Sequence, residues 1–419
     1  MSQVDRKLAW TPPPRPEWVA SVNAEAECMD IRGVIPLDEA SLLRAAMRKT
    51  GLSDFGGDEW LPHFRFILNA MEEEADFNLM GRITARAHLL NILEGRLQIE
   101  DTYKKHPEID DEVIKQPMFI IGQGRSGTSV LQNILSSDPH NKELTCWEAM
   151  FPAPPPEALT YETDPRIALT DQFIQQWVRI NPATGSVHEW TGKIPVECVQ
   201  IFSYSFLSQW FILLGQITSY VDYMLKADWR PAYAYHKRVL KLLQWKNPKG
   251  HWLLKSPTYM PYLPMLLETY PDAMLVWPHR DPVKAVASVT SLAGNRNWVT
   301  SDNPRITGYE QYSDPERVSS MLEQVIDWLE DGTVPREKVC NVHYADIVDK
   351  PLETMEHIYA YFSRELTPEG RASMAAYIES NPRDARPAHR YSIGSNETVD
   401  RERQIFKRYT EYFHISLED

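Results

Sequence analysis

Residues 117–129 of the chain read Pro-Met-Phe-Ile-Ile-Gly-Gln-Gly-Arg-Ser-Gly-Thr-Ser. The apolar run 118–121 predicts a short buried β-strand, and the glycines after it predict a tight turn. The next apolar side chains fall on one face of a helix: Val130, Leu131, Ile134 and Leu135. In such a strand–turn–helix unit, backbone N–H groups converge on one point, and the helix N-terminus adds its positive end. The stretch therefore predicts an α/β core with an anion site where its first strand ends.

Arg125 supplies the cation of this loop. Gly122 and Gly127 have the spacing of the phosphate loop of nucleoside triphosphatases, but Thr128 stands where that motif has lysine. Kinases and NTPases of that class also use an acidic residue at the end of a second strand to bind magnesium. The later strand here runs instead into His-Arg-Asp at 279–281. The residues therefore favour anion binding over metal-dependent triphosphate chemistry, and we predict no metal site.

Strand-like apolar runs alternate with helical segments after this loop. The runs cover residues 252–254, 273–277 and 339–342. This alternation predicts an α/β fold in which a P-loop-like parallel sheet is flanked by helices. We expect these elements to form a core over residues 116–419.

Two regions outside the alternating pattern are predicted to be helical. Residues 1–115 form an N-terminal segment in which 61–71 and 83–97 carry helical periodicity. An aromatic-rich insertion at about 160–245 separates the first two predicted strands. Insertions of this kind are a natural place for an acceptor pocket.

Composition and charge exclude several classes of protein. The 58 acidic and 44 basic residues give a formal charge of −14, which opposes the capture of nucleic acid. The four cysteines form no metal or disulfide pattern and are expected to be buried thiols in a reducing cytoplasm. Residues 1–20 lack the apolar core of a secretion signal. The uncharged stretch 198–221 holds too many polar side chains for a membrane span and is expected to be an internal helix.

A second motif follows the predicted strand 273–277. Asp281 suits the N-cap of a helix and Pro282 its first position, so a helix is expected to begin there. Arg280 then lies at the carboxyl end of a parallel strand, where ligands of such sheets bind. Ser288 lies about two turns into the helix, and both residues could hold one phosphate. His279 is interpreted as a structural neighbour of this site.

Together the two motifs resemble the PAPS-dependent sulfotransferase family, in its bacterial branch with a helical N-terminal extension. That family binds the 5′-phosphosulfate of its donor with a loop of the type Lys/Arg-Ser-Gly-Thr-Ser/Thr, which matches residues 125–129. It holds the 3′-phosphate with an arginine and a serine eight residues later. Segment 389–394 also resembles the C-terminal part of that branch. The resemblance implies a donor site made of Arg125, Ser126, Gly127, Thr128, Ser129, Arg280, Ser288, Arg390 and Tyr391.

The resemblance implies transfer of a sulfuryl group from PAPS to an acceptor hydroxyl, leaving PAP. Arg125 and the loop donors are expected to stabilise the charge that develops during transfer. His188, which precedes a Pro-x-Glu segment as in that branch, is the first candidate for the general base. Glu197 is the second, although it could equally complement the dipole of the following helix. Lys255 is expected to contact the sulfate or the bridging oxygen.

Two alternative functions remain open at this point. One is a non-enzymatic nucleotide- or lipid-binding protein that keeps the fold, and the other is a P-loop kinase or NTPase with a displaced basic residue. The aromatic insertion favours a small apolar molecule or a lipid as acceptor. No short motif identifies that acceptor, and the sequence leaves the oligomeric state open, a homo-oligomer included.

Overall fold

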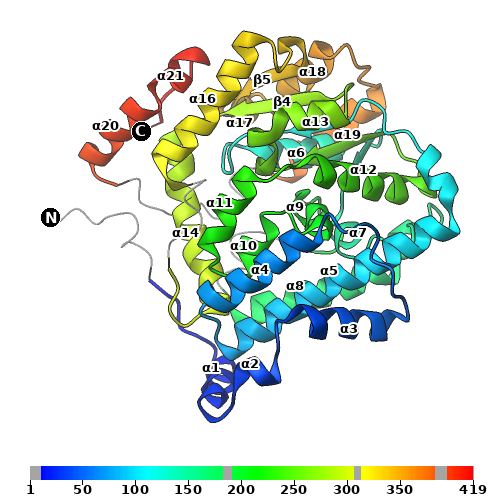
Figure 1. Cartoon of the computed structure of the whole chain (residues 1–419). Coiled ribbons are helices and arrows are strands. Elements are labelled where there is room, and N and C mark those ends of the chain that lie inside the picture. The colour runs from blue at the N-terminus through cyan, green and yellow to red at the C-terminus, as the bar shows by residue number, and fades with distance from the viewer. Residues whose placement is uncertain (1–10, 183–190, 306–312, 383–393, 419) are drawn as a thin grey trace.

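The computed structural model describes residues 11–182, 191–305, 313–382 and 394–418, apart from the side chains of Ser288 and of residues 290–293 (Figure 1). Its five strands are β1 (Met118–Ile120), β2 (Asn141–Glu143), β3 (His251–Lys255), β4 (Met274–His279) and β5 (Val339–His343). They form one parallel sheet in the order β2-β3-β1-β4-β5. The predicted parallel sheet flanked by helices is confirmed. Strand β2 was not predicted, because its sequence Asn-Lys-Glu carries no apolar pattern.

The two faces of the sheet bury alternate side chains of each strand. Met118 and Ile120 point into a core shared with α6 (Thr128–Ser136), α18 (Pro351–Tyr361) and α19 (Pro368–Ser380). Phe119 and Ile121 point into a larger core on the opposite face. The helices that contribute to that larger core include α12 (Arg230–Trp245), α13 (Leu263–Thr269) and α16 (Pro315–Asp331). Burial on both faces explains why the strands are continuously apolar.

The helices of the N-terminal region are α1 (Glu17–Ala24), α2 (Ile31–Val34), α3 (Glu39–Thr50), α4 (Leu61–Glu74) and α5 (Leu79–Lys105). The expected apolar face of α4 is confirmed by the burial of Phe64, Ile67 and Met71. The face expected for α5 is partly wrong, since Ile83 is 40% exposed. Helix α5 packs against α3, α7 (Cys146–Met150), α10 (Trp210–Leu214) and α14 (Pro282–Thr300), so it buries more than one stripe. Its core is continuous with that of the insertion, and the division at residue 115 remains a prediction.

The insertion consists of several helices in place of the one expected over 198–221. They are α8 (Pro165–Ile180), α9 (Val199–Phe202), α10 (Trp210–Leu214), α11 (Thr218–Lys226) and α12. The expectation of one internal helix is wrong because Phe206 adopts a left-handed φ of 54° and the chain turns again at Gly215. A Cβ at Gly215 would lie 2.9 Å from the Phe77 ring, so the close approach of the N-terminal region favours glycine there.

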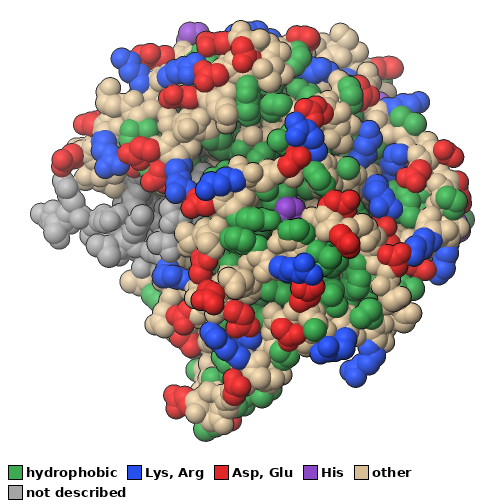
Figure 2. All heavy atoms as spheres, in the orientation of Figure 1, with side chains coloured by type: hydrophobic (Ala, Val, Ile, Leu, Met, Phe, Trp, Pro, Cys, Tyr) green, Lys and Arg blue, Asp and Glu red, His purple; other side chains and the backbone are tan. Residues whose placement is uncertain are grey.

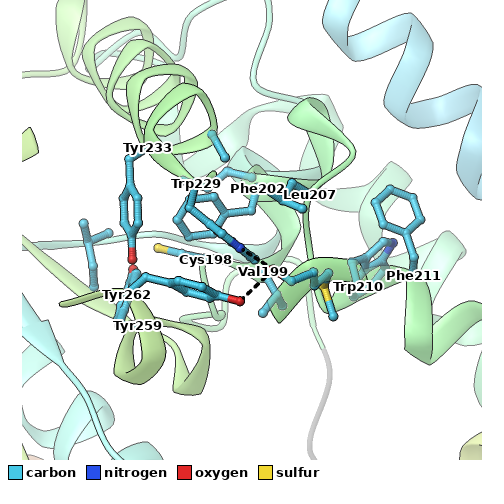
Figure 3. Packing of buried hydrophobic residues seen from close by; sticks show 14 of the residues in the cluster. Cys198, Val199, Phe202, Leu207, Trp210, Phe211, Trp229, Tyr233, Tyr259 and Tyr262 are labelled. Atoms are coloured by element: carbon cyan, nitrogen blue, oxygen red, sulfur yellow. Dashed lines mark hydrogen bonds between the residues drawn. The ribbon is translucent and has the colours of Figure 1, made fainter. Parts of the chain in front are cut away.

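Aromatic side chains of the insertion form much of the larger core (Figure 3). Trp229 and Tyr262 stack with ring centroids 4.4 Å apart, and both donate hydrogen bonds to the Met224 carbonyl. Three aromatic residues of the insertion, Tyr204, Trp210 and Tyr220, are buried in this packing. Most aromatic side chains of the insertion therefore stabilise the core, and only a few line a cavity.

The remaining helices are α7 (Cys146–Met150), α14 (Pro282–Thr300), α17 (Tyr344–Asp349), α20 (Asn396–Ile405) and α21 (Lys407–Tyr412). Among the described helices, none has both the length and the apolar character that crossing a membrane requires. Three of the four cysteines are buried as expected, but Cys28 is exposed because it lies in a short 3₁₀ helix at the edge of the molecule. On the face seen in Figure 2, acidic and basic side chains are interspersed, so this face offers no broad basic surface.

Candidate active site

The loop after β1 has the backbone conformation that its glycines predict. Gly122 has a φ of +116° and Gly127 a φ of +98°, in the left-handed region that favours glycine. A Cβ at Gly127 would also lie 2.9 Å from the Tyr344 ring. Gly127 is the N-cap of α6 and brings no side-chain acceptor to its first turn. The N-terminal end of α6 therefore faces the loop as an anion-binding position.

Arg125 and Ser126 play different parts in this loop. Arg125 has a φ of 71°, an uncommon value for a residue with a side chain, and its side chain lines a cleft next to the loop. The Ser126 hydroxyl instead donates to the Gln123 carbonyl at 2.7 Å, inside the loop. Ser126 is almost fully buried. In this conformation Ser126 stabilises the turn, while Arg125 lines the cleft.

The cleft has a volume of about 270 Å³ and lies at the carboxyl edge of the sheet. It collects residues from segments far apart in the sequence. We describe its lining residues as two groups. The first group consists of Gly124, Arg125, Gly127, Thr128, Ser129, Val130, Arg280 and Tyr344, and the second consists of Glu197, Val199, Gln209, Ile212, Leu213, Pro257 and Val289. The parallel register explains this convergence, because β1, β3, β4 and β5 all end at this edge.

Lys255 contacts one residue from each of the two groups that line the cleft. It is the last residue of β3 and only 6% exposed. Its ammonium group donates to Ser129 Oγ at 3.1 Å and pairs with Glu197 Oε1 at 3.0 Å. The backbone N–H of Cys198 also donates to the Lys255 carbonyl at 3.0 Å, which fixes Glu197 beside the end of β3. A carboxylate, an ammonium group and a hydroxyl are thus held in a row between the loop and the insertion.

Arg280 lies at the far side of the loop. Its Nη1 donates to the Arg125 carbonyl at 2.9 Å, and its guanidinium lies 4.1 Å from the centre of the Tyr344 ring. The Glu418 carboxylate accepts two further bonds, from Nε at 2.7 Å and from Nη2 at 2.8 Å. Asp281 accepts a bond from Val283 N and caps α14 as expected. These contacts hold the partly buried Arg280 guanidinium beside the loop after β1.

His279 does not face the cleft. It is buried, and its two ring nitrogens are bonded to the Tyr409 hydroxyl and to Asn341 Oδ1, each at 2.9 Å. Burial lowers the pKa of His279 to about 3. Its interpretation as a structural neighbour of Arg280 is confirmed by these contacts.

The structure brings most of the predicted site residues together. Arg125, Gly127, Thr128, Ser129, Glu197 and Arg280 line the cleft, and Lys255 reaches it through Ser129 and Glu197. Ser288 lies in α14, eight residues after Arg280, but its side chain is outside the described part. His188, Arg390 and Tyr391 lie outside the described residues. Their predicted roles remain predictions.

Sequence reasoning did not assign a role to Tyr344 or Glu418. Tyr344 directly follows β5, and its position after a parallel strand is a signal that could have placed it at this edge. Glu418 carries no such signal, because its contact with Arg280 spans 138 residues. Val199, Ile212 and Leu213 of the cleft come from the short helices α9 and α10, whose boundaries the sequence did not show. Within the described ranges, no three His, Cys, Asp or Glu side chains gather to form a metal site.

Comparisons with known proteins agree with this geometry. Sulfotransferase STF1 from Mycobacterium tuberculosis is 28% identical, and the match covers 88% of this chain and 98% of that one with a TM-score of 0.73. Sulfotransferase STF9 from Mycobacterium avium is 26% identical, with 91% and 97% covered and a TM-score of 0.77. A comparison with curated protein sequences found no match. The profile of the sulfotransferase family matches residues 117–368, which contain the loop, Lys255 and Arg280, and this chain therefore belongs to that family.

Proposed function

We propose that the protein transfers a sulfuryl group from PAPS to the hydroxyl of a small apolar or lipid acceptor. One observation carries the donor assignment: a glycine loop at a helix N-terminus and Arg280 line a single cleft. An anion position at the helix N-terminus and a second one at Arg280 suit a donor with a 5′-phosphosulfate and a 3′-phosphate. The residues present therefore fit this donor.

The loop and Lys255 are positioned to stabilise the leaving group. In the transfer, a bond forms between the acceptor oxygen and sulfur, and the bond between sulfur and the bridging oxygen of the donor breaks. Negative charge then develops on the bridging oxygen. Arg125, the hydroxyls of Thr128 and Ser129 and the Lys255 ammonium group lie where they can donate to it.

The acceptor hydroxyl must give its proton to a base, for which two residues are candidates. Glu197 lies in the cleft, held beside Lys255. His188 was the first choice from the sequence and lies outside the described residues. We expect substitution of the base to lower kcat by about 100- to 10,000-fold while PAP still binds. Comparing His188→Ala with Glu197→Gln identifies which of the two fills this role.

The aliphatic side chains that line the cleft support the proposal of an apolar acceptor. Val199, Ile212, Leu213 and Val289 present aliphatic side chains to the cleft. Gln209 also lines an adjoining cavity of about 550 Å³, to which Met224, Leu225, Trp229 and Met321 contribute. An acceptor with an extended apolar part could lie along both cavities. We expect kcat/KM to rise with the length of that apolar part, and Leu213→Ser to raise the acceptor KM without changing the affinity for PAP.

Calorimetric titration with PAP, beside ATP with magnesium, tests the donor assignment. We expect PAP to bind and Arg280→Ala to weaken it by about 10- to 100-fold, since a bidentate charged contact is lost. Arg230→Ala is a matched control, because Arg230 is an exposed arginine paired with Glu268 and is not among the residues that line the cleft. Binding of ATP without binding of PAP would overturn the proposal in favour of a kinase or NTPase. Equal PAP affinity in wild type and Arg280→Ala would show that the 3′-phosphate site lies elsewhere.

A further inference from the structure

The carboxylate of Glu418 lies on the arginine that we assign to the donor's 3′-phosphate. Nε and Nη2 of Arg280 donate to its two oxygens in a bidentate arrangement, at 2.7 and 2.8 Å. The backbone N–H of Glu418 donates to Asp281 Oδ2 at 3.0 Å. The side chain of Glu418 is half-buried and that of Arg280 is more buried still. Three hydrogen bonds thus hold this acidic residue at the end of β4.

A phosphate on Arg280 would need the same two N–H groups. Nη1 is directed at the Arg125 carbonyl and the Tyr344 ring lies against the guanidinium, so the Nε/Nη2 edge offers the parallel pair. This pair of N–H donors can bind either a carboxylate or a phosphate through two parallel hydrogen bonds. Two anions cannot share it, because like charges at that separation repel each other. Binding of a 3′-phosphate and the Glu418 contact therefore exclude each other.

The segment that carries Glu418 is anchored close to Arg280. Phe413 stacks on His279 with ring centroids 4.0 Å apart and also contacts Trp277. Phe413 and Ile415 are buried, while Leu417 is 50% exposed. The anchor keeps the carboxylate at a high local concentration beside Arg280 even when it is displaced.

We propose that Glu418 is an affinity- and specificity-determining residue of the donor site, which competes with the 3′-phosphate for Arg280. This inference rests on the proposed function. A phosphate carries about −1.5 to −2 charges and a carboxylate −1, so the 3′-phosphate displaces Glu418 when the donor binds. After transfer the carboxylate competes with PAP for the same edge and favours its release. A nucleotide without a 3′-phosphate leaves the Arg280–Glu418 pair intact, and its affinity does not depend on Glu418.

The test is calorimetric titration of the full chain with PAP and with adenosine 5′-phosphate. Glu418→Gln keeps the size of the side chain and removes its charge. We expect this variant to bind PAP about five- to tenfold more tightly, because a partly buried ion pair no longer has to be broken. Its affinity for adenosine 5′-phosphate should equal that of wild type. Glu411→Gln is the matched control, since Glu411 is an exposed glutamate on α21 paired with Lys407, and should change neither affinity.

The outcomes separate this inference from the proposed function. Tighter PAP binding in Glu418→Gln alone, with adenosine 5′-phosphate unaffected, supports competition at Arg280. Equal PAP affinity in wild type and Glu418→Gln overturns the inference while the donor assignment stands. Tighter binding of both nucleotides also overturns it, because a general change in charge would then explain the effect. Failure of wild type to bind PAP overturns the proposed function and this inference with it.

Discussion

We propose that Lys255 acts as a catalytic cation. It ends a central strand, is almost fully buried, and both of its partners, Ser129 and Glu197, belong to the cleft. A buried ammonium group is stable only when paired or hydrogen-bonded, and Glu197 supplies its charge partner. When a sulfuryl group enters beside Ser129, the same ammonium group can turn one of its three N–H donors to the bridging oxygen. We propose that the Lys255–Glu197 ion pair thereby contributes to transition-state stabilisation during transfer.

We predict that Lys255→Met lowers kcat by about 100- to 1000-fold, the usual effect of removing one donor to a developing oxyanion. Steady-state kinetics with the donor varied should show a smaller change in KM than in kcat, since Arg280 still holds the 3′-phosphate. The control is Lys237→Met, because Lys237 lies on α12, bonds to the Thr269 carbonyl at the end of α13 and is not among the residues that line the cleft. A variant with normal kcat would mean that Lys255 serves only to hold Glu197.

A second prediction concerns two glycines of the donor loop. Gly127→Ala should weaken PAP binding by about tenfold or more, because its left-handed φ costs about 1–2 kcal/mol with a side chain and the Cβ would press on Tyr344. Gly124→Ala should have a smaller effect, since a Cβ there would meet nothing within 4 Å. Calorimetry on both variants checks the order, and equal losses would contradict a role for backbone conformation at Gly127.

Strand β2 and helix α7 show how a polar element is held inside the fold. Lys142 Nζ pairs with Glu148 Oε1 at 3.2 Å, and both side chains are at most 1% exposed. Glu148 also accepts from the N–H and hydroxyl of Thr145, which completes a capping box at the start of α7. The Lys142 ammonium lies 4.9 Å from the Trp252 ring. The buried Lys142 ammonium group is therefore compensated by the helix that follows the strand, whereas Glu143 pairs with Lys249 at 3.6 Å.

We predict that Lys142→Met lowers the free energy of unfolding by about 3–5 kcal/mol, because it leaves the buried Glu148 carboxylate without a counter-charge. Urea denaturation followed by circular dichroism measures this change in the free energy of unfolding. The double variant Lys142→Met/Glu148→Gln should recover part of the loss, which a thermodynamic cycle quantifies. Additive losses in the double variant would show that the two charges do not interact.

The same elements show what a sequence can and cannot reveal. Local signals sufficed for the start of α14, where Asp281 and Pro282 occupy the N-cap and first helical positions, and for β1 and its glycine turn. Strand β2 was missed because its stability comes from the distant Trp252 and from Glu148, not from apolar patterning. The stretch 198–221 was misread because Phe206 bends the chain and its ring packs against Trp60 and Phe64 of another segment. Long-range packing of this kind produces no hydrophobic periodicity in the sequence.

At the scale of the whole molecule, the N-terminal helices pack against the core through backbone contacts. A Cβ at Gly81 would lie 2.0 Å from the carbonyl oxygen of Thr300, and Asn78 N donates to that oxygen at 3.0 Å. The start of α5 is thereby joined to the end of α14, the helix that begins beside Arg280. The helices that the sequence placed in a separate segment thus support the helix that follows Arg280 and carries Val289 of the cleft.

Three histidines are buried within the described ranges of the chain, and they make its stability depend on pH. His88 lies in α5, His236 in α12 and His279 at the end of β4. Burial lowers their pKa values from 6.5 to about 4, about 3 and about 3, respectively. The folded protein therefore keeps them neutral at pH 5, whereas the unfolded chain protonates them below about pH 6.5. Each contributes stability above that pH that is progressively lost as the pH falls toward its folded pKa.

We predict that the protein loses about 2 kcal/mol of stability per buried histidine between pH 7 and pH 5, which thermal or urea unfolding at several pH values should show. Carboxylates with ordinary pKa values near 4 contribute little in this window. His236→Phe keeps a ring against Phe202, on which His236 stacks at 4.7 Å, and removes one titrating group. Its stability should fall about 2 kcal/mol less than that of wild type over the same window. An identical pH dependence in the two proteins would show that His236 is not held neutral by its burial.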